Sequence, residues 1–192
     1  MRLIYFPTLI LVFVCGCVQI EKYPDSWGSI EPDILAPECS LIKNSYYNRG
    51  KKPDGTAVYL AVWLAPETNA KTQEERKEQT RVMDDLFKAK IVELELIDNN
   101  ILKVRAKGTD IYHQWSFDKE KKQLECKNGI LSVLQKGDRS GDNVVAFSSG
   151  ASDLYFSENY LSVNSHGGVV GITLLIPYTA YGSNWARFEV KE

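Results

Sequence analysis

The residues of this chain with the clearest potential for chemistry are two cysteines, Cys15 and Cys17, separated by Gly16. They stand at the end of an apolar run, and the chain becomes polar within a few residues after them. A cysteine thiolate is both a nucleophile and a metal ligand, so the pair could belong to a redox centre, a metal site or a processing site. The elements around the two cysteines must decide among these interpretations.

The segment before the cysteines has the organisation of a secretory signal peptide. Met1 and Arg2 form a short positive region, and residues 3–14 form an apolar region interrupted by Pro7. A transmembrane helix needs about 20 apolar residues, and this run is shorter. We therefore expect residues 1–16 to be a signal peptide that is removed, with an uncleaved anchor or a plain secretory signal as the alternatives.

The residues around the expected cleavage point carry a resemblance. Val14-Cys15-Gly16-Cys17 resembles the lipobox of bacterial lipoproteins, in which a small residue precedes the cut and an obligatory cysteine follows it. The resemblance implies that the Cys17 thiolate forms a thioether with a phospholipid-derived diacylglycerol, and that the chain is cut between Gly16 and Cys17. The family usually carries Ala, Ser or Thr where this chain has Cys15. Val18 rather than Asp follows the cysteine, which implies sorting to the outer membrane.

The lipobox resemblance thus predicts a protein anchored in the outer membrane through acylated Cys17 and facing the periplasm. The lipidated Cys17 would carry two or three acyl chains, and each methylene buried in the bilayer would contribute about 0.8 kcal/mol to membrane binding. Loss of Arg2 with the leader leaves 22 basic and 25 acidic residues, a formal net charge of −3. No long basic run is present, so we do not expect nucleic acid as a partner.

A second resemblance concerns residues 23–50. The segment "CSLIKNSYYNRG" resembles an element, roughly Cys-Pro-x-Leu-x-Gly-x-Tyr-x-Asn-x-Gly, of an uncharacterised group of proteobacterial lipoproteins, where it follows a Tyr-Pro-x-Ser-Trp segment. Ser40 and Asn44 depart from its Pro and Gly, although Asn is the next-best residue for a positive φ. The resemblance supports the lipoprotein class and implies no activity. The matching residues are Tyr23, Pro24, Ser26, Trp27, Cys39, Ile42, Tyr46, Asn48 and Gly50.

Two further cysteines, Cys39 and Cys126, remain once Cys15 leaves with the leader and Cys17 is acylated. An even pair in an oxidising compartment predicts one disulfide between them. Two separate buried thiols are the alternative. A disulfide would tie the entry of the domain to the middle of its sheet.

The mature chain divides by composition into a tether and one domain. Residues 17–38 are rich in proline and show little periodicity, so we expect a lipidated N-terminus followed by a flexible tether. Residues 39–192 are expected to form a single domain.

The pattern of this domain predicts a fold that is mainly β with one α-helix, an antiparallel meander forming a barrel or a sandwich. The helix is expected over 72–90, with a capping box of Thr72 and Glu75 and an apolar stripe on its second half. From residue 91 onward the pattern has period two and turn signals recur. An apolar run at 167–180 indicates a buried strand. The expected strands cover 57–65, 91–98, 101–107, 111–117, 122–126, 130–135, 143–148, 153–157, 160–164, 169–177 and 184–190.

The chain has only two histidines, His113 and His166, so a metal cluster of the usual His and Cys type lacks ligands. His113 stands on an apolar strand face, which indicates a hydrogen-bonded core histidine. His166 lies in "NSHGG", which indicates a turn. The segment 137–143 is similar in spacing to a calcium loop but lacks its sixth-place Gly and closing Glu, so a hairpin turn is expected.

No pattern of residues indicates an enzyme, a metal or a cofactor, and the sequence predicts a non-enzymatic protein. Its expected role is structural or adaptor-like, through binding another component of the cell envelope. The alternative is a lipocalin-like carrier with an apolar cavity that holds a small lipophilic ligand. The side chains that would face such a ligand, and that suit core filling equally well, are Trp63, Tyr112, Trp115 and Trp185.

Overall fold

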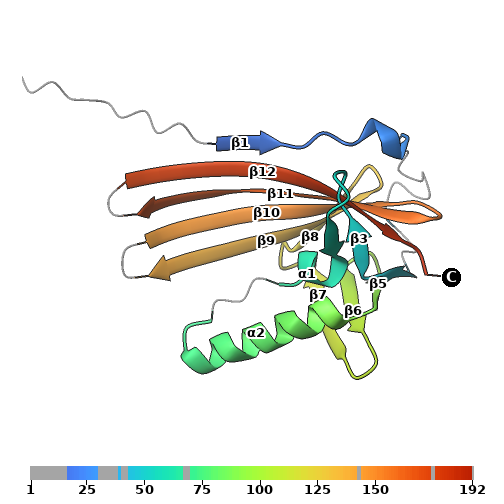
Figure 1. Cartoon of the computed structure of the whole chain (residues 1–192), viewed down its shortest axis with the longest axis horizontal. Coiled ribbons are helices and arrows are strands. Elements are labelled where there is room, and N and C mark those ends of the chain that lie inside the picture. The colour runs from blue at the N-terminus through green and yellow to red at the C-terminus, as the bar shows by residue number, and fades with distance from the viewer. Residues whose placement is uncertain are drawn as a thin grey trace, which may run out of the picture.

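The computed structural model describes residues 17–29, 39, 43–66, 70–141, 144–173 and 176–191. The expected signal peptide, with Cys15 and Gly16, lies outside these residues, as do Ile42 and the second half of the expected tether. Two open sheets, antiparallel except where β1 pairs with β12, and one long helix make up most of the described chain (Figure 1). The prediction of a mainly β fold with one α-helix is therefore confirmed, in a layered rather than a closed arrangement.

The larger sheet has the strand order β4-β3-β12-β11-β10-β9-β8, and β1 also pairs with β12. The smaller sheet has the order β2-β5-β6-β7. The strands of the larger sheet are β1 (Cys17–Ile20), β3 (Arg49–Lys51), β4 (Ala57–Tyr59), β8 (Leu124–Lys127), β9 (Ile130–Gly141), β10 (Val144–Phe156), β11 (Tyr160–Thr173) and β12 (Ile176–Glu189). Those of the smaller sheet are β2 (Lys43–Tyr47), β5 (Ile91–Ile97), β6 (Ile101–Lys107) and β7 (Tyr112–Asp118). The helices are η1 (Asp25–Trp27), α1 (Leu60–Trp63) and α2 (Gln73–Lys88).

The smaller sheet follows the alternation expected from the sequence. Val92 and Leu94 of β5 are fully buried, whereas Glu93 and Glu95 point to the opposite, solvated face. There the Arg105 guanidinium donates to Glu95 at 2.7 Å and so lowers the pKa of that carboxyl. One face therefore packs in the core and the other is stabilised by cross-strand ion pairs.

Helix α2 begins where the capping box predicts. The Glu75 amide donates to Thr72 Oγ1 at 3.1 Å, and the Thr72 amide donates to Glu75 Oε2 at 3.0 Å. The first half of the helix is exposed, and Leu86 in the second half is its one buried residue. The helix thus packs on the core through its C-terminal turns only.

The hydrophobic core lies between the two sheets, beneath only one end of the larger one. At their other end the long strands β9 to β12 extend well beyond the smaller sheet, and the N-terminal half of α2 runs in the same direction as they do (Figure 1). Core residues come from both sheets and from the segments that connect them. The fully buried large side chains are Tyr46, Leu60, Leu64, Leu86, Val92, Leu94, Leu102, Val104, Leu131, Leu154, Leu161 and Phe188.

The predicted division of the C-terminal half into short strands is wrong. The segments expected as 143–148 and 153–157 form one strand, β10, and β11 runs through the turn expected at His166. The expected buried strand at 167–180 instead spans the end of β11 and the start of β12. The sequence analysis assigned Gly167 to a turn, whereas in the structure this glycine allows β11 to pack closely against β10. A Cβ on Gly167 would lie 2.7 Å from the carbonyl oxygen of Ser149 on β10.

Two other expectations differ from the structure. The strand predicted over 57–65 ends at Tyr59, and Leu60–Trp63 form the short helix α1. Periodicity does not distinguish a short buried helix from a strand in a continuous apolar run. The segment expected as a flexible tether is also partly folded. Its residues 17–20 form β1 against β12, because the edge of β12 offers free backbone groups.

Asn48 connects the elements around the core. Its side-chain amide donates to the carbonyl oxygens of Leu86 and Ala89 at 2.8 Å each, at the end of α2. Its side-chain oxygen accepts from the Ala61 amide at 2.8 Å, and its backbone oxygen accepts from the Leu60 amide at 2.8 Å. This fully buried asparagine thereby caps the start of α1 and the end of α2 together.

Replacement of Asn48 by Ala should lower the free energy of unfolding by about 2–4 kcal/mol, because three buried backbone groups lose their partner. Urea denaturation would measure the loss as a lower midpoint at an unchanged slope. Asn159→Ala, at an exposed turn, is the matched control and should change stability little. Equal midpoints for the two variants would contradict the role of Asn48.

Candidate functional site

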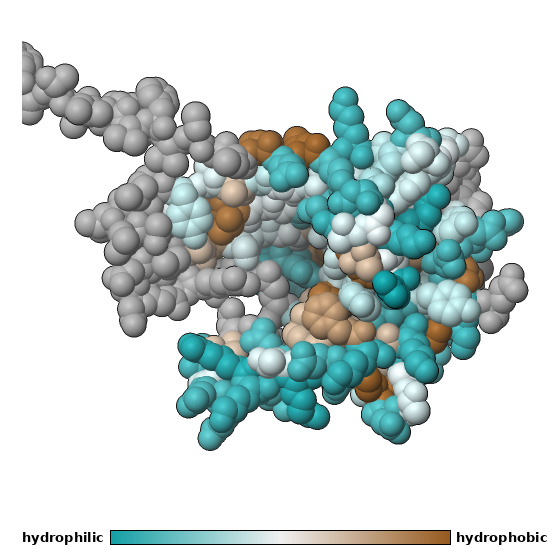
Figure 2. Space-filling model, in the orientation of Figure 1, coloured by the Kyte–Doolittle hydropathy of each residue, from teal (hydrophilic) through white to brown (hydrophobic). Residues whose placement is uncertain are grey.

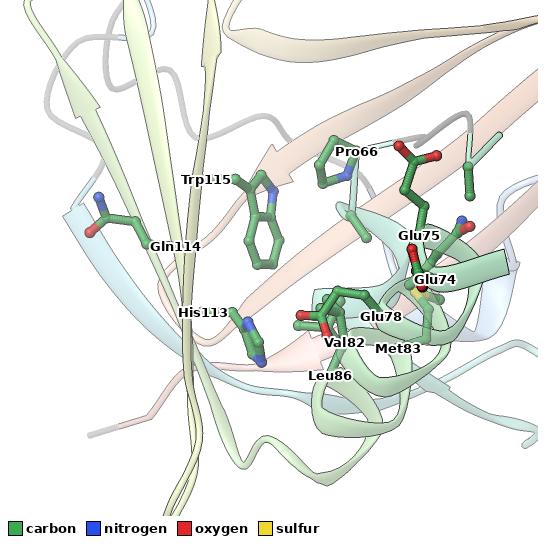
Figure 3. Close-up of a pocket in the computed structure, with 13 residues that line it drawn as sticks. Pro66, Glu74, Glu75, Glu78, Val82, Met83, Leu86, His113, Gln114 and Trp115 are labelled. Carbon is green, nitrogen blue, oxygen red and sulfur yellow. The ribbon is translucent and has the colours of Figure 1, made fainter. Parts of the chain in front are cut away.

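An open groove of about 610 Å³ lies between α2 and β7 (Figure 3). It exists because the charged first half of α2 does not pack on the sheet, whereas the second half does. Trp115 and His113 point from β7 toward the helix, and Gln114 points away from it. The residues that line the groove are Ala65, Pro66, Ala70, Glu74, Glu75, Glu78, Gln79, Val82, Met83, Leu86, His113, Gln114 and Trp115.

The floor of this groove is apolar. Val82, Met83 and Leu86 face it from α2, and Trp115 faces it from β7. The Trp115 indole donates to the carbonyl oxygen of Leu64 at 2.7 Å, so the polar edge of the ring is satisfied and its orientation is fixed. An apolar partner that covered the floor would therefore gain hydrophobic free energy without breaking a hydrogen bond.

The rim of the groove is acidic. The backbone amides of Thr72 and Lys71 lower the pKa of the Glu75 carboxyl, and Arg81 lowers that of Glu78 through a hydrogen bond. Both carboxyls are therefore ionised at neutral pH. Glu74 adds a third carboxyl to the rim.

His113 closes one end of the groove. Its Nε2 lies 3.1 Å from Asp85 Oδ2 of α2, which fastens β7 to the helix. The predicted hydrogen bond of His113 is confirmed, but the prediction of a core position is wrong, because the side chain is partly exposed where it lines the groove. His166 lies elsewhere, within β11, with its Nε2 at 3.0 Å from Asp153 Oδ2 of β10. Among the residues that the structure describes, no group of three His, Cys, Asp or Glu side chains could hold a metal ion.

The four aromatic residues predicted to face a ligand do not meet in one cavity. Trp115 lines the groove, but Trp63 packs toward the core, with its ring 6.3 Å from that of Phe188. Tyr112 is 60% exposed on β7. Trp185 is buried on the far face of the larger sheet, with its ring 4.9 Å from that of Tyr23.

The sequence analysis did not identify the acidic rim. The signal for it was the run of charged residues 74–78, in which three of the five are Glu.

The Tyr-x-Asn-x-Gly element is explained by packing. Tyr46 is fully buried, and burial raises the pKa of its hydroxyl to about 12. Asn48 joins the two helices, as described above. Gly50 faces β12 so closely that a Cβ would lie 2.5 Å from the carbonyl oxygen of Arg187. These three residues therefore support the core, and none of them lines the groove.

The Tyr-Pro-x-Ser-Trp segment also ends on β12. The Arg187 guanidinium donates to the Tyr23 hydroxyl at 2.6 Å and to the carbonyl oxygen of Trp27 at 2.8 Å. Its Cζ lies 4.7 Å from the centre of the Trp27 ring, a cation–π contact. The two segments that resemble the lipoprotein group therefore meet at Arg187, although they are separated along the chain.

The predicted disulfide between Cys39 and Cys126 is present, with an S–S distance of 2.04 Å. It links the chain just before β2 to β8 at the edge of the larger sheet. Cys17 is the first residue of β1, and its acylation remains a prediction. None of the helices within the described ranges is long and apolar enough to cross a membrane.

Comparison with protein-family models, with curated proteins and with solved structures found no match to this chain. The functional interpretation therefore rests on the geometry of the groove and on the motifs of the sequence.

Removal of the disulfide in a Cys39→Ser, Cys126→Ser double variant should lower the free energy of unfolding by up to about 4–5 kcal/mol. The reason is the large loop that it closes, with its cysteines 87 residues apart. Urea denaturation of both proteins, with and without a reductant, would measure the effect. A reductant that destabilised the double variant as much as the parent protein would contradict this prediction.

Proposed function

We propose that this protein is a non-enzymatic adaptor, anchored by lipid to the outer membrane, which binds a segment of another envelope protein between α2 and β7. The observation that carries the adaptor role is the open groove, with its apolar floor and acidic rim. The anchor is supported by the lipobox resemblance at Cys17. A disulfide suits the oxidising periplasm, which is consistent with this location.

The chemistry of the groove favours a partner with apolar and basic side chains. Its volume of about 610 Å³ lies within the range of small-molecule sites, about 300–1,000 Å³, so the choice of partner rests on the chemistry of the lining. The apolar floor would take aliphatic or aromatic side chains of the partner. The carboxylates of Glu74 and Glu75 would attract a Lys or Arg beside them, whereas that of Glu78 is already paired with Arg81. Both requirements are met by a short amphipathic segment of protein.

A carrier of a small lipophilic ligand is the second candidate function, and the apolar floor around Trp115 favours it. Because the two sheets are open, such a ligand would lie in this groove rather than inside a barrel. The three rim carboxylates favour the adaptor, since a neutral lipophilic molecule gains nothing from them.

Replacement of Cys17 by Ser should abolish the uptake of radiolabelled palmitate, because a hydroxyl does not replace the thiolate in forming the thioether. Cys15→Ser is the matched control and should keep the label, since that residue would leave with the leader. Label retained by the Cys17→Ser variant would refute the proposed anchor.

A photo-crosslinking residue at Val82, in the floor of the groove, should capture a discrete envelope protein in intact cells. In this background Glu74→Lys should reduce the crosslinked product by roughly two- to tenfold, because it reverses a charge on the rim. Glu120→Lys, at an exposed turn remote from the groove, is the matched charge control and should leave the product unchanged.

Native mass spectrometry of the purified protein separates the two candidates. A bound lipophilic molecule that is lost in a Met83→Asp variant, without a crosslinked protein, would favour the carrier and contradict the adaptor.

A further inference from the structure

The four longest strands end at one level, far from the core. Val144 pairs with both Gly141 and Thr173, and Thr173 pairs with Ile176, so the described ends of β9, β10, β11 and β12 lie at one level. We call residues 144–149, 168–173 and 176–181 the distal sheet end. Figure 1 shows it extending beyond the smaller sheet, on the side toward which the N-terminal end of α2 also points.

The start of β1 lies at this same end. Cys17 is in register with Ala180, and β1 runs parallel to β12 from there toward the core. Ile176, where β12 begins, therefore lies four residues beyond Cys17 along the strand axis. At about 3.3 Å for each residue of a strand, Ile176 lies roughly 13 Å past Cys17.

The residues that follow Cys17 are fixed to the larger sheet and form no flexible linker. Residues 17–20 are paired along β12, and the next residue, Glu21, is bonded to β12 through its backbone amide and its side-chain carboxylate. The Glu21 amide donates to Ser183 Oγ at 3.0 Å, and Glu21 Oε2 accepts from the Trp185 amide at 2.9 Å. A lipid on Cys17 would thus hold the distal sheet end directly at the bilayer surface, without a flexible spacer.

The surface beside this anchor suits lipid. Phe147 is 60% exposed and Val170 is 61% exposed, and the strand register places them on one face together with Val18 and Ile20 of β1. Figure 2 shows apolar surface over β1. From Gly167 to Ala186 the sequence carries no Asp, Glu, Lys or Arg. Val170 lies on this uncharged segment, whereas Phe147 is in register with Asp138 of β9. Exposed apolar side chains gathered on one face mark an interaction surface.

We propose that the distal sheet end inserts into the headgroup layer of the bilayer that anchors the protein. This inference rests on the proposed acylation of Cys17. The anchor selects a bilayer over a second copy as the occupant, because it keeps this surface within roughly 13 Å of the lipid at all times. The open edges of β1 and β9 limit insertion to the interface, where water or headgroups still satisfy their backbone groups.

The proposal has a consequence for the groove. The smaller sheet and the C-terminal end of α2, which packs on the core, lie at the opposite end of the long strands (Figure 1). A sheet seated by its distal end would hold the α2–β7 groove at a set orientation to the bilayer.

The test places an environment-sensitive dye at position 170 in the full, acylated chain. With Cys39 and Cys126 in their disulfide and Cys17 acylated, a Val170→Cys variant would offer a single thiol for the label. Tyr112→Cys is the matched control, since Tyr112 is 60% exposed on the smaller sheet. Each labelled protein is reconstituted in vesicles of phosphatidylethanolamine and phosphatidylglycerol, with or without a lipid that carries a nitroxide quencher near the headgroup.

Insertion predicts strong quenching of the dye at position 170, and emission there shifted to shorter wavelength, with little change at position 112. An added Phe147→Asp substitution should reduce the quenching at 170 severalfold, because it places a charge on the inserted face. Acylated protein with equal, weak quenching at both positions would overturn the inference while leaving the anchor intact. Disulfide-linked pairs formed through position 170 between two copies would overturn it in favour of self-association. An N-terminal peptide without acyl mass would overturn the anchor itself, and the inference with it.

Discussion

The buried side chain of Asn48 is the constraint on which the rest of the domain depends. One side-chain amide serves two carbonyl oxygens at the end of α2, while the side-chain and backbone oxygens of the same residue receive the first amides of α1. A helix end buried without partners is costly, and this single residue removes that cost for two helices at once. Because α2 is fastened at its C-terminal end, its charged N-terminal half projects free of the sheet. The groove beneath it is a direct result of this arrangement.

Strand β12 is the second organising element, because segments from both ends of the chain converge on it. Arg187 binds the Tyr23 and Trp27 segment on one face, and Gly50 of β3 approaches the backbone of the same residue. Nearer its start, β12 pairs with β1, so residues 17–20 lie beside the strand that carries residues 176–189. The conformation of the N-terminal segment is therefore coupled to that of the domain. If Cys17 carries a lipid, the domain would therefore be attached to the membrane at a fixed point rather than through a flexible tether.

The α2–β7 groove and the distal sheet end differ in chemistry. The groove joins an apolar floor to ionised carboxylates, which favours a cationic segment of protein. The distal sheet end joins exposed apolar residues to an uncharged segment of sequence, which favours lipid. Because the two surfaces share no residue, attachment through one does not occupy the other.

The sequence by itself determined the features that depend on neighbours along the chain. These are the capping box at Thr72, the alternating strands β5 to β7, and the mainly β class with one helix. The pairing of Cys39 with Cys126 also followed, since only two cysteines were left to pair. Tertiary structure alone decided the features that depend on distant residues. Leu60–Trp63 form a helix because Asn48 caps them, and Gly167 lies within a strand because β10 passes so close to it. The groove itself was not predictable, because its floor joins Val82 to Trp115 only after the sheet and the helix meet. Local patterns state what each segment prefers, whereas contacts between distant segments determine which preference prevails.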